Sequence, residues 1–484
     1  MLIIKKSFTI LSAAALLAAT GCQKLEDFND NPNATTSAPI NALLTNVEAG
    51  LGSYGFQTTP GYYCQYFSQT QYTSESNYST PQADFNGTYS GSLEDMQNIT
   101  DNAANNSNNM VQVAKIVKNY LYWTITDRWG DVPYTQALKG GSGNNAYDPQ
   151  EIIYKGMLAE VTEAVNSFDA TSPITGDLMN NNDVALWKKT GNSLRMLMAL
   201  RLSKRYPAAG DYAATEFSAA MTADGGYIAD NTSNFKIAYP TSSAAFKNPI
   251  YVNYDGRKDN AETTTMTNLL GNLGDGRIAV YGGLSELPSS VDPNWNVTSA
   301  KGFPYGLNRD PATTFINANP DWARVLRGDF RLPQSPIYLI TAAQVNFAIA
   351  EAIDRGWVSG DMNTFYTNGI NASFSQYGLI PAASYFTQSG VALSAPAGSA
   401  ANLKNLSIQR YIATYPDGLQ GWSDWRRTGY PELTPTPTAT NDSKQIPRRY
   451  TYGTGEYGSN NANTKAAAAA IGSDSQDTHV WWDK

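Results

Sequence analysis

The sequence predicts a mainly α-helical fold, in which tetratricopeptide-like helix hairpins form a scaffold and long irregular segments form one face. Apolar residues recur with the α-helical period in many segments, and several of these open on a capping residue and end at a glycine. Two stretches, about 54–91 and 230–335, break this pattern because they are rich in Gly, Pro, Asn and aromatic residues. Since one hairpin cannot bury its own apolar faces, neighbouring hairpins must stack.

Composition limits the class of protein. The chain has 484 residues, more than the roughly 250–300 at which a single core stops growing. Hydrophobic residues make up 42% of it, enough for a packed core, so wholesale disorder is excluded. A net charge of −8 without a basic stripe argues against a nucleic-acid partner, whose phosphates require clustered Lys and Arg.

Histidine and cysteine are scarce. The chain has one histidine, His479, and two cysteines, which excludes multi-histidine zinc sites, four-cysteine clusters and disulfide frameworks. A Ser-His-Asp site would have to use His479, close to the last residue. We therefore expect no metal and no cofactor.

The first residues form a targeting signal. Lys5 and Lys6 precede a mostly apolar run over residues 8–19, which is too short to span a bilayer. Small residues follow, and then Cys22, in a pattern that resembles a bacterial lipobox. We predict that residues 1–21 are a lipoprotein signal peptide and that Cys22 is lipidated. The alternative is a plain secretory peptide in which Cys22 is incidental.

The next segment, residues 22–40, is polar and predicts a lipidated tether, followed by one domain over 41–484. Residues 27–31 resemble the start of a calcium loop but lack its later Gly and Glu, so a linker is the better interpretation. No later stretch reaches 18 consecutive apolar residues, so lipid is the expected membrane attachment. Cys64 is then predicted to be a small buried apolar residue.

Helix starts are marked most clearly in two places. Asp148 before Pro149 predicts a capped helix, whose apolar residues share one face as far as residue 168. Thr341 and Gln344 have capping-box spacing at the start of a helix that should end at Gly356. Further helices are expected from 183 onward and over about 361–377, 41–52, 92–106, 109–127, 211–223, 403–415 and 463–471.

Aromatic residues gather in the two irregular stretches. Rings on rigid loops offer an apolar face to a sugar or a peptide side chain, while neighbouring Asn, Gln and Ser supply neutral hydrogen-bonding groups. The alternative is that these rings hold the loops onto the helices. The predicted ligand contacts are Tyr72, Tyr78, Tyr89, Trp295, Tyr305 and Trp322. Tryptophans within predicted helices are assigned to the core instead: Trp123, Trp129, Trp187, Trp422 and Trp425.

Paired acids could in principle hydrolyse a glycoside. Glu94 with Asp95, and Asp474 with Asp477, are examples, but 42 acidic residues guarantee accidental pairs, and sequence does not show the separation that the mechanism requires. No residue is therefore predicted to be catalytic.

Several ordered motifs resemble the SusD/RagB-like outer-membrane lipoproteins of Bacteroidetes. The most specific is Thr126-Asp127-Arg128-Trp129-Gly130-Asp131-Val132-Pro133-Tyr134. Others are residues 147–154, 187–202, 350–357, 416–431, 446–450 and 480–483. The resemblance runs from Cys22 to the last residue and is weakest over 230–335. Arg426 and Arg427 in the late motif are expected to bind a carboxylate or helix carbonyls.

The resemblance implies a function without catalysis. Members of this family sit on the outside of the outer membrane above a SusC-like TonB-dependent transporter, capture oligosaccharides or sometimes peptides, and deliver them to it. This chain is similar to the branch described as SusD-like and starch-binding-associated, which does not establish starch as its ligand. Two alternatives remain: a surface glycoside hydrolase that uses paired carboxylates, and a transporter adaptor that binds no ligand.

Overall fold

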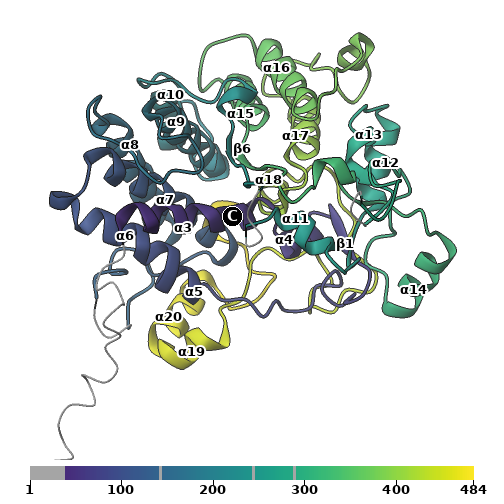
Figure 1. The fold of residues 1–484 in the computed structure, drawn as a ribbon, viewed down its shortest axis with the longest axis horizontal. Coiled ribbons are helices and arrows are strands. Elements are labelled where there is room, and N and C mark those ends of the chain that lie inside the picture. Colours follow the sequence, from purple (N-terminus) through teal and green to yellow (C-terminus); the bar gives the residue numbers. More distant parts are fainter. Residues whose placement is uncertain (1–38, 141–143, 242–245, 287–289) are drawn as a thin grey trace, which may run out of the picture.

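The computed structural model describes residues 39–140, 144–241, 246–286 and 290–484. The predicted signal peptide, Cys22 and nearly all of the predicted tether lie outside these residues. The described chain is mainly helical, with a few short strands (Figure 1). None of its helices is both long and apolar enough to cross a lipid bilayer.

Antiparallel helix pairs form the scaffold, as the sequence predicts. Successive helices pack on each other, and α9 also packs on α15, which joins an early group to a later one. Figure 1 shows the early group on the left and α15–α17 at the top. The early helices are α7 (Asn108–Trp129), α8 (Gln150–Ser167), α9 (Val184–Arg201) and α10 (Tyr212–Met221). The later ones are α15 (Ala342–Asp354), α16 (Met362–Ser375), α17 (Ala400–Thr414) and α18 (Gly418–Thr428).

The two stretches predicted to be irregular contain short elements. Helices of three to ten residues carry too few turns for a periodic signal, which is why the pattern did not reveal them. These helices are α4 (Thr58–Tyr63), α5 (Asn86–Thr88), α11 (Pro249–Tyr254), α12 (Thr264–Asn272), α13 (Ile278–Tyr281) and α14 (Arg309–Ala318). Outside them lie α3 (Ile40–Leu51), α6 (Glu94–Asp101), α19 (Thr454–Ser459) and α20 (Asn461–Ile471).

Within the described residues, two small antiparallel sheets join distant parts of the chain. One has the strand order β1-β3-β5-β4, formed by Phe67–Gln69, Asn260–Glu262, Arg324–Val325 and Gly282–Gly283. The other pairs β2 (Phe235–Ile237) with β6 (Ile337–Ile340). In the first sheet Phe67 lies opposite Glu262, so residues nearly 200 positions apart become neighbours.

One of the two predicted helix caps forms. Thr341 accepts a hydrogen bond from the Gln344 N–H, and the Gln344 side chain accepts one from the Thr341 N–H, which confirms the capping box. The predicted Asp148 cap is wrong. Its carboxylate accepts from the N–H groups of Tyr134 and Thr135 at 3.0 and 2.7 Å, so it holds the preceding loop instead.

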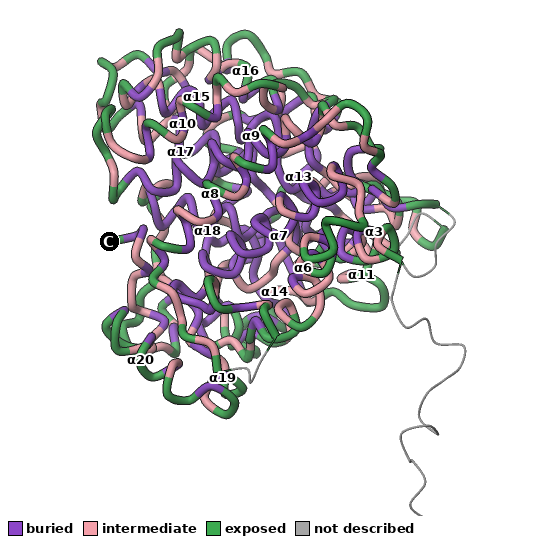
Figure 2. Tube along the Cα trace, turned by 90° about the vertical axis from the view of Figure 1, so that its left-hand side faces the viewer, coloured by how far each residue is buried: buried purple, intermediate pink, exposed green. Residues whose placement is uncertain are grey.

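The core confirms the assignments made for tryptophan and cysteine. The five tryptophans placed there are buried, and Cys64 is a buried free thiol. In Figure 2 the buried chain runs through the middle of the molecule, while exposed residues lie along its edges. Helices α4 and α18 approach very closely, because a Cβ atom added to Gly418 would lie 2.4 Å from the Gly61 nitrogen.

Buried charges bind the later helices together. Glu351 on α15 accepts from both terminal nitrogens of Arg427 on α18. Arg410 on α17 reaches Asp424 at 2.7 Å, and Arg426 donates to the Arg448 carbonyl at 2.9 Å. The expectation of a carboxylate or helix carbonyls is confirmed for Arg427, whereas the carbonyl that Arg426 binds, that of Arg448, lies outside any helix.

Candidate functional site

The six predicted ligand rings do not share one hollow. Tyr72 is 60% exposed, Tyr89, Trp295 and Tyr305 are half-buried, and Tyr78 and Trp322 are buried. All six rings lie in the predicted aromatic segments, but they differ in how much of the side chain is exposed to solvent.

Burial argues against Tyr78 and Trp322 as ligand contacts. The Trp322 side chain is 1% exposed and packs in a small apolar cluster with Phe303, while the Arg324 guanidinium lies 3.8 Å from its ring centre. The Tyr78 hydroxyl accepts from the Thr436 N–H at 3.3 Å, and its ring is buried. These two side chains hold loops onto the core, which is the alternative that the sequence left open.

The half-buried rings differ in how their polar edges are used. The Tyr89 hydroxyl donates to the Pro133 carbonyl, and the Tyr305 hydroxyl donates to the Tyr62 carbonyl at 2.6 Å. Both hydroxyls therefore tie one chain segment to another. Trp295 follows a turn in which its N–H donates to the Asp292 carbonyl at 3.2 Å, and it stays a candidate for ligand contact.

Tyr72 borders an open hollow of about 490 Å³, which we call the Tyr72 hollow. Its lining comes from three distant segments of the chain: Gln71, Tyr72, Gly256, Arg257, Lys258, Asp259 and Arg309. Aromatic, amide, cationic and carboxylate groups therefore meet on one surface. Sequence analysis did not find the last five of these residues, since only the fold brings them beside Tyr72.

The sheet fixes the floor of the Tyr72 hollow. β1 pairs with β3, and the Thr70 N–H extends the pairing by donating to the Asp259 carbonyl at 2.7 Å. The Thr70 hydroxyl donates to the Lys258 carbonyl, also at 2.7 Å. The segment that carries Tyr72 is thus held to the segment that carries the charged residues.

Two further side chains shape the rim. The side-chain oxygen of Gln69 accepts from the N–H groups of Gln71 and Tyr72 at 3.3 and 3.2 Å, which supports the turn that projects the Tyr72 ring. Arg309, at the start of α14, donates to the Thr70 carbonyl at 3.0 Å and to the Gln71 side chain at 2.7 Å. An exposed ring on a fixed turn can stack on a ligand without a large ordering cost.

One of the two acid pairs considered for hydrolysis, Asp474 with Asp477, has other partners. Asp474 binds Arg449 at 2.6 Å and accepts from the Tyr457 hydroxyl at 2.7 Å. Asp477 accepts from Asn441 at 3.1 Å and from Ser443 at 2.5 Å. Within the described ranges, no three His, Cys, Asp or Glu side chains are grouped so that they could hold a metal ion.

Comparison with known proteins identifies the family. The model of the SusD-like family described as "Starch-binding associating with outer membrane" matches residues 32–453. The chain resembles the structure of a chitin-binding SusD homolog from Flavobacterium johnsoniae, with a TM-score of 0.79 and 25% identity over 92% of this chain and 98% of that one. It also resembles a SusD homolog from Bacteroides vulgatus, with a TM-score of 0.78 and 22% identity over 92% and 97% of the two chains. None of the curated proteins matches it. Because the family match covers most of its length, the chain belongs to the SusD-like family of starch-binding proteins associated with the outer membrane.

Proposed function

We propose that this protein is a non-enzymatic lipoprotein that captures oligosaccharides at the cell surface and delivers them to a SusC-like TonB-dependent transporter. The observation that carries the proposal is the 60% exposed ring of Tyr72 above an open hollow, in a chain of a starch-binding family. The Tyr72 hollow is open to solvent, which suits an oligosaccharide that extends beyond a single pocket.

The chemistry of the hollow suits a glycan. A phenol ring offers a flat apolar face to the C–H face of a sugar, and sugar hydroxyls can bond to Gln71 and Asp259. The family description names starch, and the similar structure from Flavobacterium johnsoniae is called chitin-binding. Chains of glucose and of N-acetylglucosamine are therefore the first ligands to test, with peptides as the alternative class.

Delivery follows from tethering. Acyl chains on Cys22 would hold the protein at the membrane through the predicted tether of residues 22–40. A ligand captured beside a transporter is presented at a high local concentration, so modest affinity is sufficient.

The test is calorimetric titration of the purified protein with a maltohexaose, a chitohexaose and a peptide panel. One of the two glycans should bind, and Tyr72→Ala should weaken that binding about 5–30-fold, the effect of losing one stacked ring. The melting temperature should stay unchanged because the ring is exposed. Ile380→Ala is the matched control, since Ile380 is 91% exposed and lies outside the Tyr72 hollow.

Two results would contradict the proposal. If titration with every glycan and peptide gives no binding signal, the protein would be a transporter adaptor that binds no ligand. Release of shorter sugars, abolished by one Asp or Glu substitution, would identify a glycoside hydrolase.

A further inference from the structure

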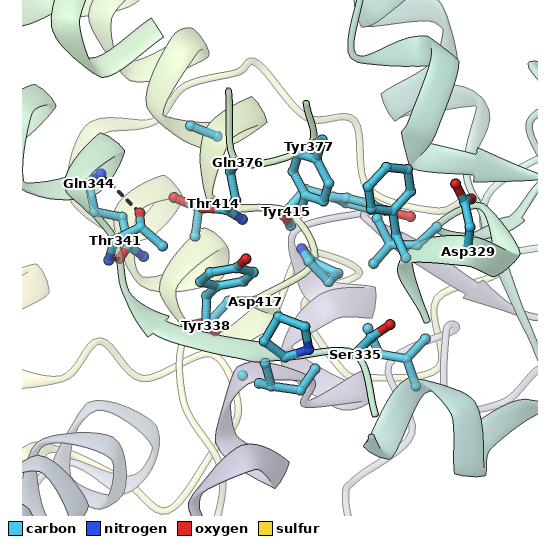
Figure 3. A pocket seen from close by; sticks show the side chains of 18 residues that line it. Asp329, Ser335, Tyr338, Thr341, Gln344, Gln376, Tyr377, Thr414, Tyr415 and Asp417 are labelled. Carbon is cyan, nitrogen blue, oxygen red and sulfur yellow. Dashed lines mark hydrogen bonds between the residues drawn. The ribbon is translucent and has the colours of Figure 1, made fainter. Parts of the chain in front are cut away.

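A second hollow, of about 240 Å³, lies among β6, the ends of α16 and α17, and the start of α18 (Figure 3). We call it the Asp417 hollow. It shares no lining residue with the Tyr72 hollow. Six of its lining residues carry the inference: Tyr338, Gln344, Gln376, Tyr377, Thr414 and Asp417.

Asp417 contributes a buried carboxyl group. Its side chain is 5% exposed and accepts from the Gln420 N–H at 3.1 Å, which caps α18. In the described part of the chain it forms no salt bridge, and no Lys, Arg or His lines the hollow. The other acid in the lining, Asp329, is already bonded to Arg327 at 2.7 and 2.8 Å. Burial raises the pKa of Asp417 to about 7.

Hydrogen-bond donors line the same hollow. The Gln344 side-chain oxygen is used in the capping box, but its nitrogen donates to no other described residue. The Tyr338 hydroxyl likewise has no hydrogen-bond partner among the described residues. Figure 3 shows the side chains of Gln376 and Tyr338 approaching the same space from opposite sides. Tyr338 and Gln376 are half-buried at the edge of the hollow, so these groups are placed to bond a polar ligand in exchange for water.

We propose that the Asp417 hollow is a second binding site, which takes a single sugar unit. Each sugar hydroxyl both donates and accepts, so it can donate to Asp417 and accept from Gln344 and Gln376. The ring faces of Tyr338 and Tyr377 provide apolar walls for its C–H groups. The site is independent of the Tyr72 hollow and extends the proposed function.

Size and charge select this class over others. Pockets for drug-sized ligands occupy about 300–1,000 Å³, so a hollow of 240 Å³ admits one ring but not a chain. An anion would be repelled by the Asp417 carboxylate, and no Lys, Arg or His lines the hollow to offset that repulsion. A compact amine is the competing class, because Asp417 would pair with its ammonium group, and the glucosamine result below separates the two classes.

The test uses the detergent-solubilised lipoprotein and two probes, glucose and N-acetylglucosamine, titrated by saturation-transfer difference NMR. At least one should bind. Above the raised pKa of Asp417, where its carboxyl group is charged, Asp417→Asn should weaken binding about tenfold or more, because a bond to a charged acceptor is lost. Asn caps a helix as well as Asp, so the variant should fold, and its melting curve checks this. Gln376→Ala, at a half-buried position after α16, should also weaken binding.

Controls separate the two sites. Tyr72→Ala should leave the affinity for the single sugar unchanged, whereas Asp417→Asn should leave binding at the Tyr72 hollow unchanged. Loss of the sugar signal when a hexasaccharide competes supports the end of a captured chain as the natural occupant. Persistence of the signal supports a free sugar.

Three results would overturn the inference. The first is a folded protein that binds neither sugar at the highest soluble concentration. The second is equal binding by the wild type, Asp417→Asn and Gln376→Ala. The third is binding of glucosamine, through its ammonium group, without binding of either neutral probe.

Discussion

Glu262 on β3 is a carboxyl group in the core. It is 1% exposed, and neither of its carboxyl oxygens has a hydrogen-bond partner among the described residues. Burial raises its pKa well above the usual value of 4.5. The folded protein therefore keeps the Glu262 proton at a pH where the unfolded chain releases it.

This difference predicts how one substitution responds to pH. Above pH 4.5 the unfolded state binds fewer protons than the folded state, so Glu262 costs stability that grows as pH rises, up to its folded pKa. Glu262→Met removes the carboxyl group, and its gain in unfolding free energy should widen by about 1.4 kcal/mol per pH unit above that point. Denaturant titrations between pH 5 and about 8 measure it.

The control is Glu163→Met, whose side chain is 64% exposed, and which should show a constant difference from the wild type. If the free energy of unfolding of the wild type and of Glu262→Met changed in parallel with pH, this carboxyl group would not be buried as described.

Residue types were easier to predict than their exposure. Composition located the aromatic segments, yet Tyr72 points to solvent while Tyr78, six positions later, is buried. Tyr78 has a φ of +65°, which lies in the left-handed region that few residues other than glycine adopt. Periodicity carries no information about such turns, and sequence therefore did not reveal which rings face outward.

At the scale of helices, buried charge pairs join α15, α17 and α18 in addition to their apolar contacts. Burial alone would raise the pKa of Glu351, but Arg427 and Arg355 hold it well below its usual range. Its contribution to stability is therefore present above pH 4.5 and is lost as pH falls through the lowered pKa. Periodicity did not predict α18, since its charged residues are as buried as its apolar ones.

Removing the Glu351 charge should destabilise this joint. Glu351→Gln removes the nearer counter-ion of buried Arg427 and leaves it only the Asp424 contact at 3.5 Å, so the free energy of unfolding should fall by about 3–5 kcal/mol at pH 7. The same substitution at Glu432, whose side chain is 73% exposed and pairs with Lys404 at 2.9 Å, should change little. Equal melting temperatures for the two variants would contradict the structural role of the buried pair.

Helix pairs could be predicted because the apolar period of each helix is a local signal, supported in places by a cap such as Thr341 or a following glycine such as Gly356. The helices near α7–α10 and α15–α17 follow from that signal. The strands could not be predicted, because each has only two to four residues and pairs with a distant segment.

In the whole molecule, the helical scaffold supports a surface that local sequence does not define. The pairing of β1 with β3 brings Tyr72 beside residues 256–259, and α14 adds Arg309. The family could be predicted from ordered motifs, whereas the Tyr72 and Asp417 hollows depend on contacts between segments far apart in the chain.

The central claim, capture of a glycan without cleavage, is tested most directly by incubating the protein with an end-labelled oligosaccharide and recovering both bound and free fractions. Mass spectrometry then gives the length of each recovered chain. We expect a saturable bound fraction whose chains keep their full length, and much less of it with Tyr72→Ala. Shortened chains in either fraction, or no bound glycan from any member of the panel, would contradict the account.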